Sequence, residues 1–148
     1  MTELTVRSPA FEKNKPIPMK YTCDGDNVNP PLILEGTPTA AKSLVLIIDD
    51  PDAPRGTFDH WVVWNIPPIG KIEENTIPGV EGLNSLGENS YVAPCPPSGT
   101  HRYFFKVYAL DAKLNLNPSA TRKKEVEHAM QNHILAQGEL IGTCRRGR

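Results

Sequence analysis

The fold class follows from residues 43–49, which read SLVLIID. This run is apolar, rich in β-branched residues and ended by an acidic turn that contains proline, so it predicts a strand buried on both faces. Two similar runs follow, WVVWNI at 61–66 and YFFKVYAL at 103–110, and shorter strands are predicted at 4–6 and 140–144. Together these runs predict a mainly β protein.

Proline is unusually frequent in this chain. The 148 residues include 15 prolines, which is about 10% and roughly twice the ordinary share. Because proline breaks helix interiors and removes a backbone donor, this content favours short strands joined by long, stiff loops. Such loops are predicted at 8–43, 50–59, 67–88 and 92–101. Long loops inside a compact domain often carry function, so the chemistry is expected there.

One helix is predicted near the C-terminus, over about residues 118–136. Asn117 is suited to cap this helix and Pro118 to occupy its first position. Apolar residues recur from Val126 with helical spacing, and Gly138 follows as a stop signal. No internal repeat or linker interrupts the chain, so residues 1–148 are predicted to form a single domain.

Charge and hydropathy exclude several classes of partner. The formal net charge is −1, so the balance of charge does not favour nucleic acid as a partner. No apolar stretch is long enough to span a membrane. The first residues, MTELTVRS, lack the pattern of a signal peptide, so a cytoplasmic location is expected.

The three cysteines follow no zinc-binding spacing, because no two of them lie close in sequence. Cys23, Cys95 and Cys144 are therefore expected to be reduced, half-buried thiols. A bridge between Cys23 and Cys95 would need an oxidising or hyperthermophilic setting.

The densest group of chemically active side chains comes directly after the strand at 43–49. The residues at 49–54 read DDPDAP, and the two prolines fix the backbone on both sides of Asp52. If the strands at 43–49 and 60–66 pair, Asp50 and His60 lie at the same edge of the sheet and are able to meet. An Asp–His pair orients the imidazole and raises its pKa. A solvated turn beside a histidine at the edge of the core is the simpler alternative.

A second polar group lies where a proline-rich loop enters the strand at 103–110. The residues at 94–103 read PCPPSGTHRY. On a strand His101 and Tyr103 point to the same face and Arg102 points to the other. Imidazole, phenol and backbone N–H groups together suit an anion, whereas Arg102 is better placed to pair with a carboxylate that holds the loops.

Both groups resemble the signature regions of the phosphatidylethanolamine-binding protein family. The matching stretches are DPDAP at 50–54 with HWVV at 60–63, and PPSGTHRYFF at 96–105. Flanking stretches, SPAF at 8–11, YTCDG at 21–25, NPPL at 29–32 and ELIGT at 139–143, extend the resemblance to the compact prokaryotic branch over nearly the whole chain.

The resemblance implies a sandwich of two antiparallel sheets with Greek-key connections, a helix near the C-terminus, and a cavity for phosphate-type anions, including phospholipid head groups. Carried over by position, the pocket residues of this chain are Asp50, Asp52, Pro54, His60, Pro96, His101 and Tyr103. Several relatives inhibit serine proteases or regulate kinases, so such a protein is a further candidate partner.

The expected function is therefore non-catalytic binding of a small anion, with no cofactor. In this hypothesis Asp50 and Asp52 orient His60 and His101 and favour their protonated forms, so that the ligand meets N–H and O–H donors. The alternative is an enzyme that uses either a metal held by Asp50, His60 and His101 or the thiol of Cys95. An exposed sheet edge is also compatible with a homodimer.

Overall fold

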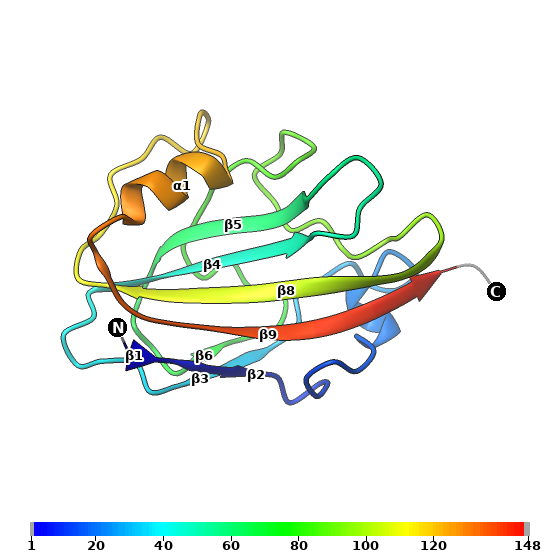
Figure 1. Ribbon diagram of the computed structural model, residues 1–148, viewed down its shortest axis with the longest axis horizontal. Helices are drawn as coiled ribbons and strands as arrows, with labels where there is room; N and C mark the ends of the chain where they lie inside the picture. Colours follow the sequence, from blue (N-terminus) through cyan, green and yellow to red (C-terminus); the bar gives the residue numbers. More distant parts are fainter. Residues whose placement is uncertain (1, 147–148) are drawn as a thin grey trace.

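The computed structural model describes residues 2–146, which fold into two β-sheets with one α-helix (Figure 1). The strands are β1 (Thr2–Glu3), β2 (Thr5–Arg7), β3 (Leu32–Glu35), β4 (Ser43–Asp50), β5 (Phe58–Ile66), β6 (Lys71–Ile72), β7 (Val80–Glu81), β8 (Gly99–Leu110) and β9 (Ile134–Arg146). The helix is α1 (Lys123–Met130), and a 3-10 turn, η1, spans Met19–Tyr21. The mainly β prediction is confirmed.

The strands form a larger sheet in the order β1-β9-β8-β4-β5-β7 and a smaller one in the order β2-β3-β6. All pairs are antiparallel except β1 with β9. In the larger sheet β4, β5 and β7 are successive neighbours, and β8 returns to lie beside β4. The predicted architecture of two antiparallel sheets is therefore confirmed.

Strand β4 is buried on both of its faces, as residues 43–49 predict. Leu44, Leu46 and Ile48 belong to the core between the two sheets. Val45 and Ile47 belong to a second core, which α1 covers with Val126 and Met130. Since successive side chains alternate between faces, a continuous apolar run is what a strand between two cores requires.

The other predicted strands are present but differ in length. The runs at 61–66, 103–110 and 140–144 lie within the longer β5, β8 and β9. Residues 5 and 6 of the predicted strand at 4–6 belong to β2, whereas Leu4 lies between β1 and β2. Its carbonyl oxygen covers Gly138 so closely that a Cβ there would overlap it. Glycine at 138 therefore lets the N-terminal segment cross over β9.

Helix α1 is shorter than the predicted 118–136. Asn117 does cap, but it caps a turn: its side-chain oxygen accepts the N–H of Ser119 at 3.1 Å. The helix begins only after Arg122, whose N–H is accepted by the Glu125 carboxylate at 2.8 Å. It ends before Asn132, whose φ of 69° is left-handed, and β9 begins at Ile134. The predicted stop, Gly138, lies inside that strand.

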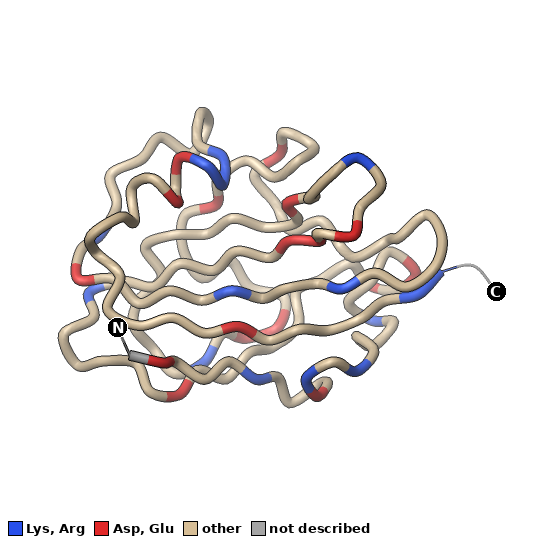
Figure 2. The backbone as a smooth tube through the Cα atoms, viewed as in Figure 1, with Lys and Arg blue, Asp and Glu red and all other residues tan. Residues whose placement is uncertain are grey.

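Acidic and basic residues are interspersed around the fold (Figure 2). Asp49 is buried beneath α1 and not exposed at the surface. Lys106 and Lys123 contact the same oxygen of its carboxylate at 3.1 and 3.2 Å. Lys123 also reaches Asp59 at 2.8 Å. This ion-pair network ties the helix to β4, β5 and β8. No helix among residues 2–146 is long and apolar enough to cross a membrane.

Candidate functional site

The two polar groups predicted from sequence meet at one end of the core between the sheets, where β4 ends and β5 and β8 begin. A cavity of about 220 Å³ lies there. We call it the histidine pocket; it is lined by Asp50, Ala53, Pro54, Phe58, His60, Val92, Ala93, Cys95, Pro96, Pro97, His101 and Tyr103. Six of the seven residues proposed from sequence are in this set, and Asp52 is not.

Asp50 and His101 form a buried pair in the wall of the histidine pocket. The Nδ1–H of His101 donates to Oδ2 of Asp50 at 2.6 Å. The other carboxylate oxygen of Asp50 accepts the N–H of Asp52 at 2.8 Å. With both oxygens held, the carboxylate fixes the orientation of the His101 ring and leaves Nε2 as the ring nitrogen available to a ligand.

His60 is brought into the pocket by an irregularity of β5. Ile48 pairs with Trp61 and Asp49 with Asp59, so His60 is an extra residue opposite β4. Such a bulge re-aims a side chain. The ring of His60 packs against Phe58 and Tyr103, with centroids 4.7 and 5.2 Å away.

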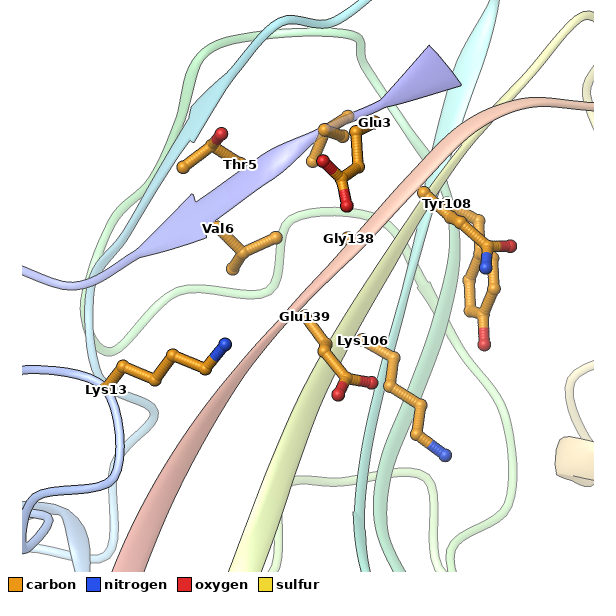
Figure 3. Close-up of a pocket in the computed structure, with 10 residues that line it drawn as sticks. Glu3, Thr5, Val6, Lys13, Lys106, Tyr108, Gly138 and Glu139 are labelled. Atoms are coloured by element: carbon orange, nitrogen blue, oxygen red, sulfur yellow. The ribbon is translucent and has the colours of Figure 1, made fainter. Parts of the chain in front are cut away.

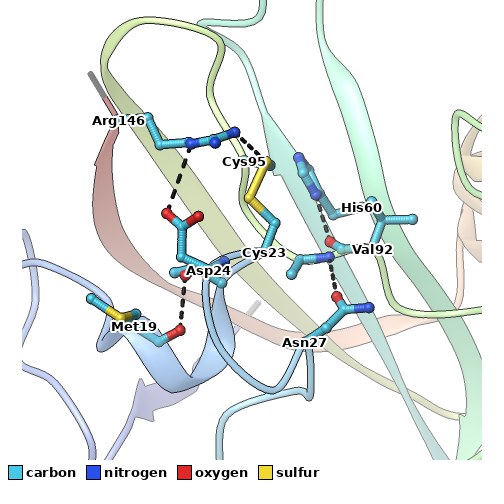
Figure 4. Close-up of a disulfide and its surroundings, with 10 residues drawn as sticks. Met19, Cys23, Asp24, Asn27, His60, Val92, Cys95 and Arg146 are labelled. Atoms are coloured by element: carbon cyan, nitrogen blue, oxygen red, sulfur yellow. Dashed lines mark hydrogen bonds and ion pairs between the residues drawn. A yellow bond between two sulfur atoms is a disulfide. The ribbon is translucent and has the colours of Figure 1, made fainter.

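The partner of His60 is a backbone carbonyl. The Nδ1–H of His60 donates to the Val92 oxygen at 2.6 Å (Figure 4). The predicted contact between Asp50 and His60 is therefore wrong, because Asp50 instead bonds to His101. Burial lowers the pKa of His60 below its ordinary value. The unliganded ring is neutral at pH 7, which differs from the expected protonated form.

Tyr103 presents a neutral phenol to the same cavity. Burial, followed by the nearby charge of Asp50, raises the pKa of Tyr103 far above its ordinary value. The hydroxyl therefore keeps its proton and is able to donate at any physiological pH. His101 and Tyr103 are both buried on the inner face of β8, and Arg102 is exposed on the other face, as their spacing predicts.

Asp52 lies outside the histidine pocket and pairs with Arg102. Its two oxygens accept Nε and Nη2 of Arg102 at 2.9 Å each, and one of them also accepts the Arg102 backbone N–H. These bonds lower the pKa of Asp52 to about 2. The expected orienting role toward the histidines is not seen for Asp52. It instead holds the loop at 51–57 against the start of β8.

A disulfide joins Cys23 to Cys95, whose Cα atoms are 5.4 Å apart (Figure 4). The expectation that both are reduced is wrong. The two loops that carry them are already held together, because Cys23 N–H donates to the Pro94 carbonyl at 3.1 Å. Cys144 is a buried free cysteine, as expected.

Sequence reasoning missed half of the pocket lining. Ala53, Cys95 and Pro97 lie inside the motifs at 50–54 and 94–103. Phe58 lies two residues before His60, so alternation along β5 is a signal for it. Val92 contributes its backbone carbonyl and Ala93 a small apolar surface. Neither contribution can be predicted from the residue type.

A larger hollow of about 860 Å³ lies elsewhere, over the outer side of β8 and β9 where the N-terminal segment crosses (Figure 3). Its lining includes Glu3, Lys13, Lys106, Tyr108 and Glu139. None of the seven residues proposed from sequence lines it. Its side chains stand apart around an open surface (Figure 3), so the histidine pocket is the better candidate site.

Two observations bear on the enzymatic alternatives. Within residues 2–146, no group of three His, Cys, Asp or Glu side chains is placed to hold a metal ion. Cys95 is bonded to Cys23, so it does not carry the free thiol that a thiol-based reaction at this residue requires.

Comparison with known proteins gives one consistent family. Residues 7–145 match the family model described as phosphatidylethanolamine-binding protein. A UPF0098 protein of Pyrococcus horikoshii is 50% identical over 150 residues, which cover 94% of this chain and 75% of that protein. A UPF0098 protein of Methanothermobacter thermautotrophicus is 47% identical, covering 97% of this chain and all of the relative.

Solved structures agree. The crystal structure of a phosphatidylethanolamine-binding protein homologue from Chlamydia trachomatis superposes with a TM-score of 0.93 at 42% identity, covering 99% of this chain and 100% of the other. Escherichia coli YbcL, described as a member of the mammalian family, superposes with a TM-score of 0.89 at 26% identity over the same shares of the two chains.

Proposed function

Since this chain belongs to the phosphatidylethanolamine-binding protein family, we propose that the histidine pocket binds a small phosphate-type anion without catalysing a reaction. Free phosphate and a phospho head group share this chemistry. The anion contacts His60, His101 and Tyr103, while Pro54 and Pro96 form apolar walls. Asp50 orients His101, and Asp52 acts only through Arg102.

One observation carries the proposal: two imidazoles and a phenol line the same small cavity, and an internal acceptor holds the Nδ1–H of each ring. Each ring therefore presents Nε2 in a fixed direction. Protonated imidazole and phenol donate short, strong bonds to phosphate oxygens. The cavity volume of about 220 Å³ lies below the roughly 300–1,000 Å³ of pockets for drug-sized ligands, so it suits a head group.

We expect loss of either ring to weaken phosphate binding by roughly 10–100-fold, because a hydrogen bond to a charged group contributes about 1.5–3 kcal/mol. The variants are His60→Ala and His101→Ala, and titration calorimetry with inorganic phosphate measures the dissociation constant. His128→Ala, on the exposed face of α1, is the matched control and should bind as the parent does. Unchanged affinity in both pocket variants would disprove the assignment.

Glycerophosphoethanolamine, titrated in the same way, separates the two sources of the ligand. Tighter binding than inorganic phosphate indicates that the pocket recognises the head group, whereas equal binding indicates that the phosphate group alone is recognised. A ligand that uses only the Pro54 and Pro96 walls would be insensitive to both histidine substitutions.

Anion affinity should rise as the pH falls. The His60 ring is neutral in the free pocket because burial lowers its pKa, and a bound anion raises that pKa again. The complex therefore takes up a proton, so affinity is highest below the pKa of free His60 and falls by up to about tenfold per pH unit above it. Sulfate is the probe, because it keeps its charge from about pH 5 to pH 8. A sulfate affinity that is constant over this range would contradict the coupling.

A further inference from the structure

The disulfide lies in the wall of the histidine pocket and at the surface of the molecule. Cys95 lines the cavity, and both Cys95 and Cys23 are exposed residues. A reductant in solution is therefore able to reach a bond that borders the proposed ligand site. Exposed disulfides are the class that is most often labile or regulatory, whereas structural ones are usually protected.

The segment at 92–97 depends on this bond because of its composition. Pro94, Pro96 and Pro97 have no backbone N–H, so the segment has few donors with which to join a sheet. It is held instead by the loop at 22–27: the Pro94 carbonyl accepts from Cys23, and the Ala93 N–H donates to Oδ1 of Asn27 at 3.1 Å (Figure 4). The disulfide is the covalent member of this clamp.

The same segment controls His60. The Val92 carbonyl accepts the Nδ1–H of His60 at 2.6 Å, and the Val92 N–H donates to the His60 carbonyl at 3.0 Å. Only two residues separate Val92 from Cys95. Release of Cys95 would therefore loosen both the wall made by Pro96 and Pro97 and the acceptor that orients the His60 ring.

Arg146 is placed to help the bond break. Its Nη1 lies 2.9 Å from Sγ of Cys95, and its Nε lies 3.7 Å from Oδ2 of Asp24 (Figure 4). A guanidinium beside one sulfur stabilises negative charge on it, and a stabilised thiolate leaves faster in thiol–disulfide exchange. Cys95 is thus the leaving sulfur and Cys23 the one that is attacked.

We propose that the Cys23–Cys95 disulfide is a redox switch that sets the anion affinity of the histidine pocket, an inference that rests on the function proposed above. The thiolate of a dithiol reductant attacks Sγ of Cys23, the S–S bond breaks, and its electron pair leaves on Cys95. The second thiol of the reductant then displaces Cys23. The protein gains two thiols, the reductant becomes a disulfide, and an oxidised dithiol reverses the reaction.

Titration of the full chain with inorganic phosphate, before and after reduction with dithiothreitol, tests the switch. We expect about tenfold weaker binding by the reduced protein, because its wall must be ordered at the moment of binding. Cys95→Ser should bind like the reduced protein in either condition. Cys144→Ala is the matched control, and it should respond to reduction as the parent does. Equal affinity of the oxidised and reduced proteins would overturn the switch and leave the disulfide as a structural link.

Amide hydrogen exchange separates failure of the switch from failure of the ligand assignment. Without ligand, reduction should raise the exchange rates of Val92 and Ala93 and leave those of Leu46 and Ile47 in β4 unchanged. If the oxidised protein binds no phosphate, the ligand assignment fails, but selective exchange at 92–93 would still support redox control of the pocket wall. Unchanged exchange at 92–93 would overturn it.

The rate at which dithiothreitol reduces the disulfide tests the role of Arg146. Arg146→Gln should slow reduction by dithiothreitol by roughly tenfold, because it removes the charge beside the leaving sulfur. Arg146→Lys should restore part of the rate. Equal rates in all three proteins would contradict the assignment of Cys95 as the leaving sulfur.

Discussion

Replacing Asp50 with alanine is expected to lower the free energy of unfolding by about 1–3 kcal/mol and to abolish phosphate binding, because it leaves the buried Nδ1–H of His101 without its acceptor. The Asp50 and His101 side chains are only 4% and 10% exposed, and their contact is 2.6 Å. The same change also removes the acceptor for the Asp52 N–H. Equilibrium unfolding in urea measures the first effect and titration calorimetry the second.

The chain contains a matched control for this prediction. His133 and Asp111 form the same kind of bond at 2.7 Å, but their side chains are 45% and 46% exposed. Asp111→Ala should cost less than about 1 kcal/mol, because water replaces an exposed partner. If Asp50→Ala and Asp111→Ala lower the free energy of unfolding by the same small amount, burial does not strengthen the Asp50–His101 pair.

Asp50→Asn separates charge from shape. The amide oxygen is still able to accept from Asp52, but the amide nitrogen then faces Nδ1 of His101. To bond with it, His101 must carry its proton on Nε2, which is the opposite tautomer. We expect a folded protein with weakened anion binding, and the imidazole ¹⁵N shifts of His101 report the tautomer. An unchanged tautomer would show that Asp50 does not orient the ring.

Local patterns in the sequence predict the features of the fold that depend on alternation. The apolar run in β4 predicts a strand between two cores, and the spacing of His101, Arg102 and Tyr103 predicts which faces they occupy. Both follow from the period of two along a strand. The predicted helix is longer than α1 because apolar spacing continues past Met130, whereas the backbone turns left-handed at Asn132.

The pocket itself depends on features that no local pattern contains. A single extra residue in β5 turns His60 toward Tyr103, and a bulge of one residue leaves no periodic signal. The Asp50–His101 bond joins residues 51 positions apart, through the pairing of β4 with β8. The family resemblance predicts that Asp50, His60 and His101 line one pocket, but it does not predict that Asp50 bonds to His101 and not to His60.

The disulfide is the clearest case in which composition misleads. Three cysteines that lie far apart in sequence and follow no metal-binding spacing indicate free thiols. Yet the fold places the two loops side by side, where Cys23 N–H also donates to the Pro94 carbonyl. Proximity in the fold, and not spacing in the sequence, determines which cysteines pair.

Removing this disulfide is expected to lower the free energy of unfolding by about 4 kcal/mol and the melting temperature by on the order of 10 °C. The bond closes a loop between residues 72 positions apart, and an unfolded chain without it gains the entropy of that whole loop. Cys23→Ala/Cys95→Ala tests the prediction by equilibrium unfolding in urea, with Cys144→Ala as the control for loss of a cysteine. A loss below about 1 kcal/mol would contradict the loop-entropy argument.

The stability of the protein without the disulfide also determines whether reduction can act on the pocket alone. Domains of this kind have about 5–15 kcal/mol of stability, so a loss of about 4 kcal/mol leaves the reduced protein folded at 25 °C with its pocket wall loosened. Under these conditions a weaker affinity for phosphate reflects the wall and not unfolding. If the reduced protein instead unfolds in one transition below 25 °C, the disulfide is required for the fold, and reduction cannot act as a local control of the pocket.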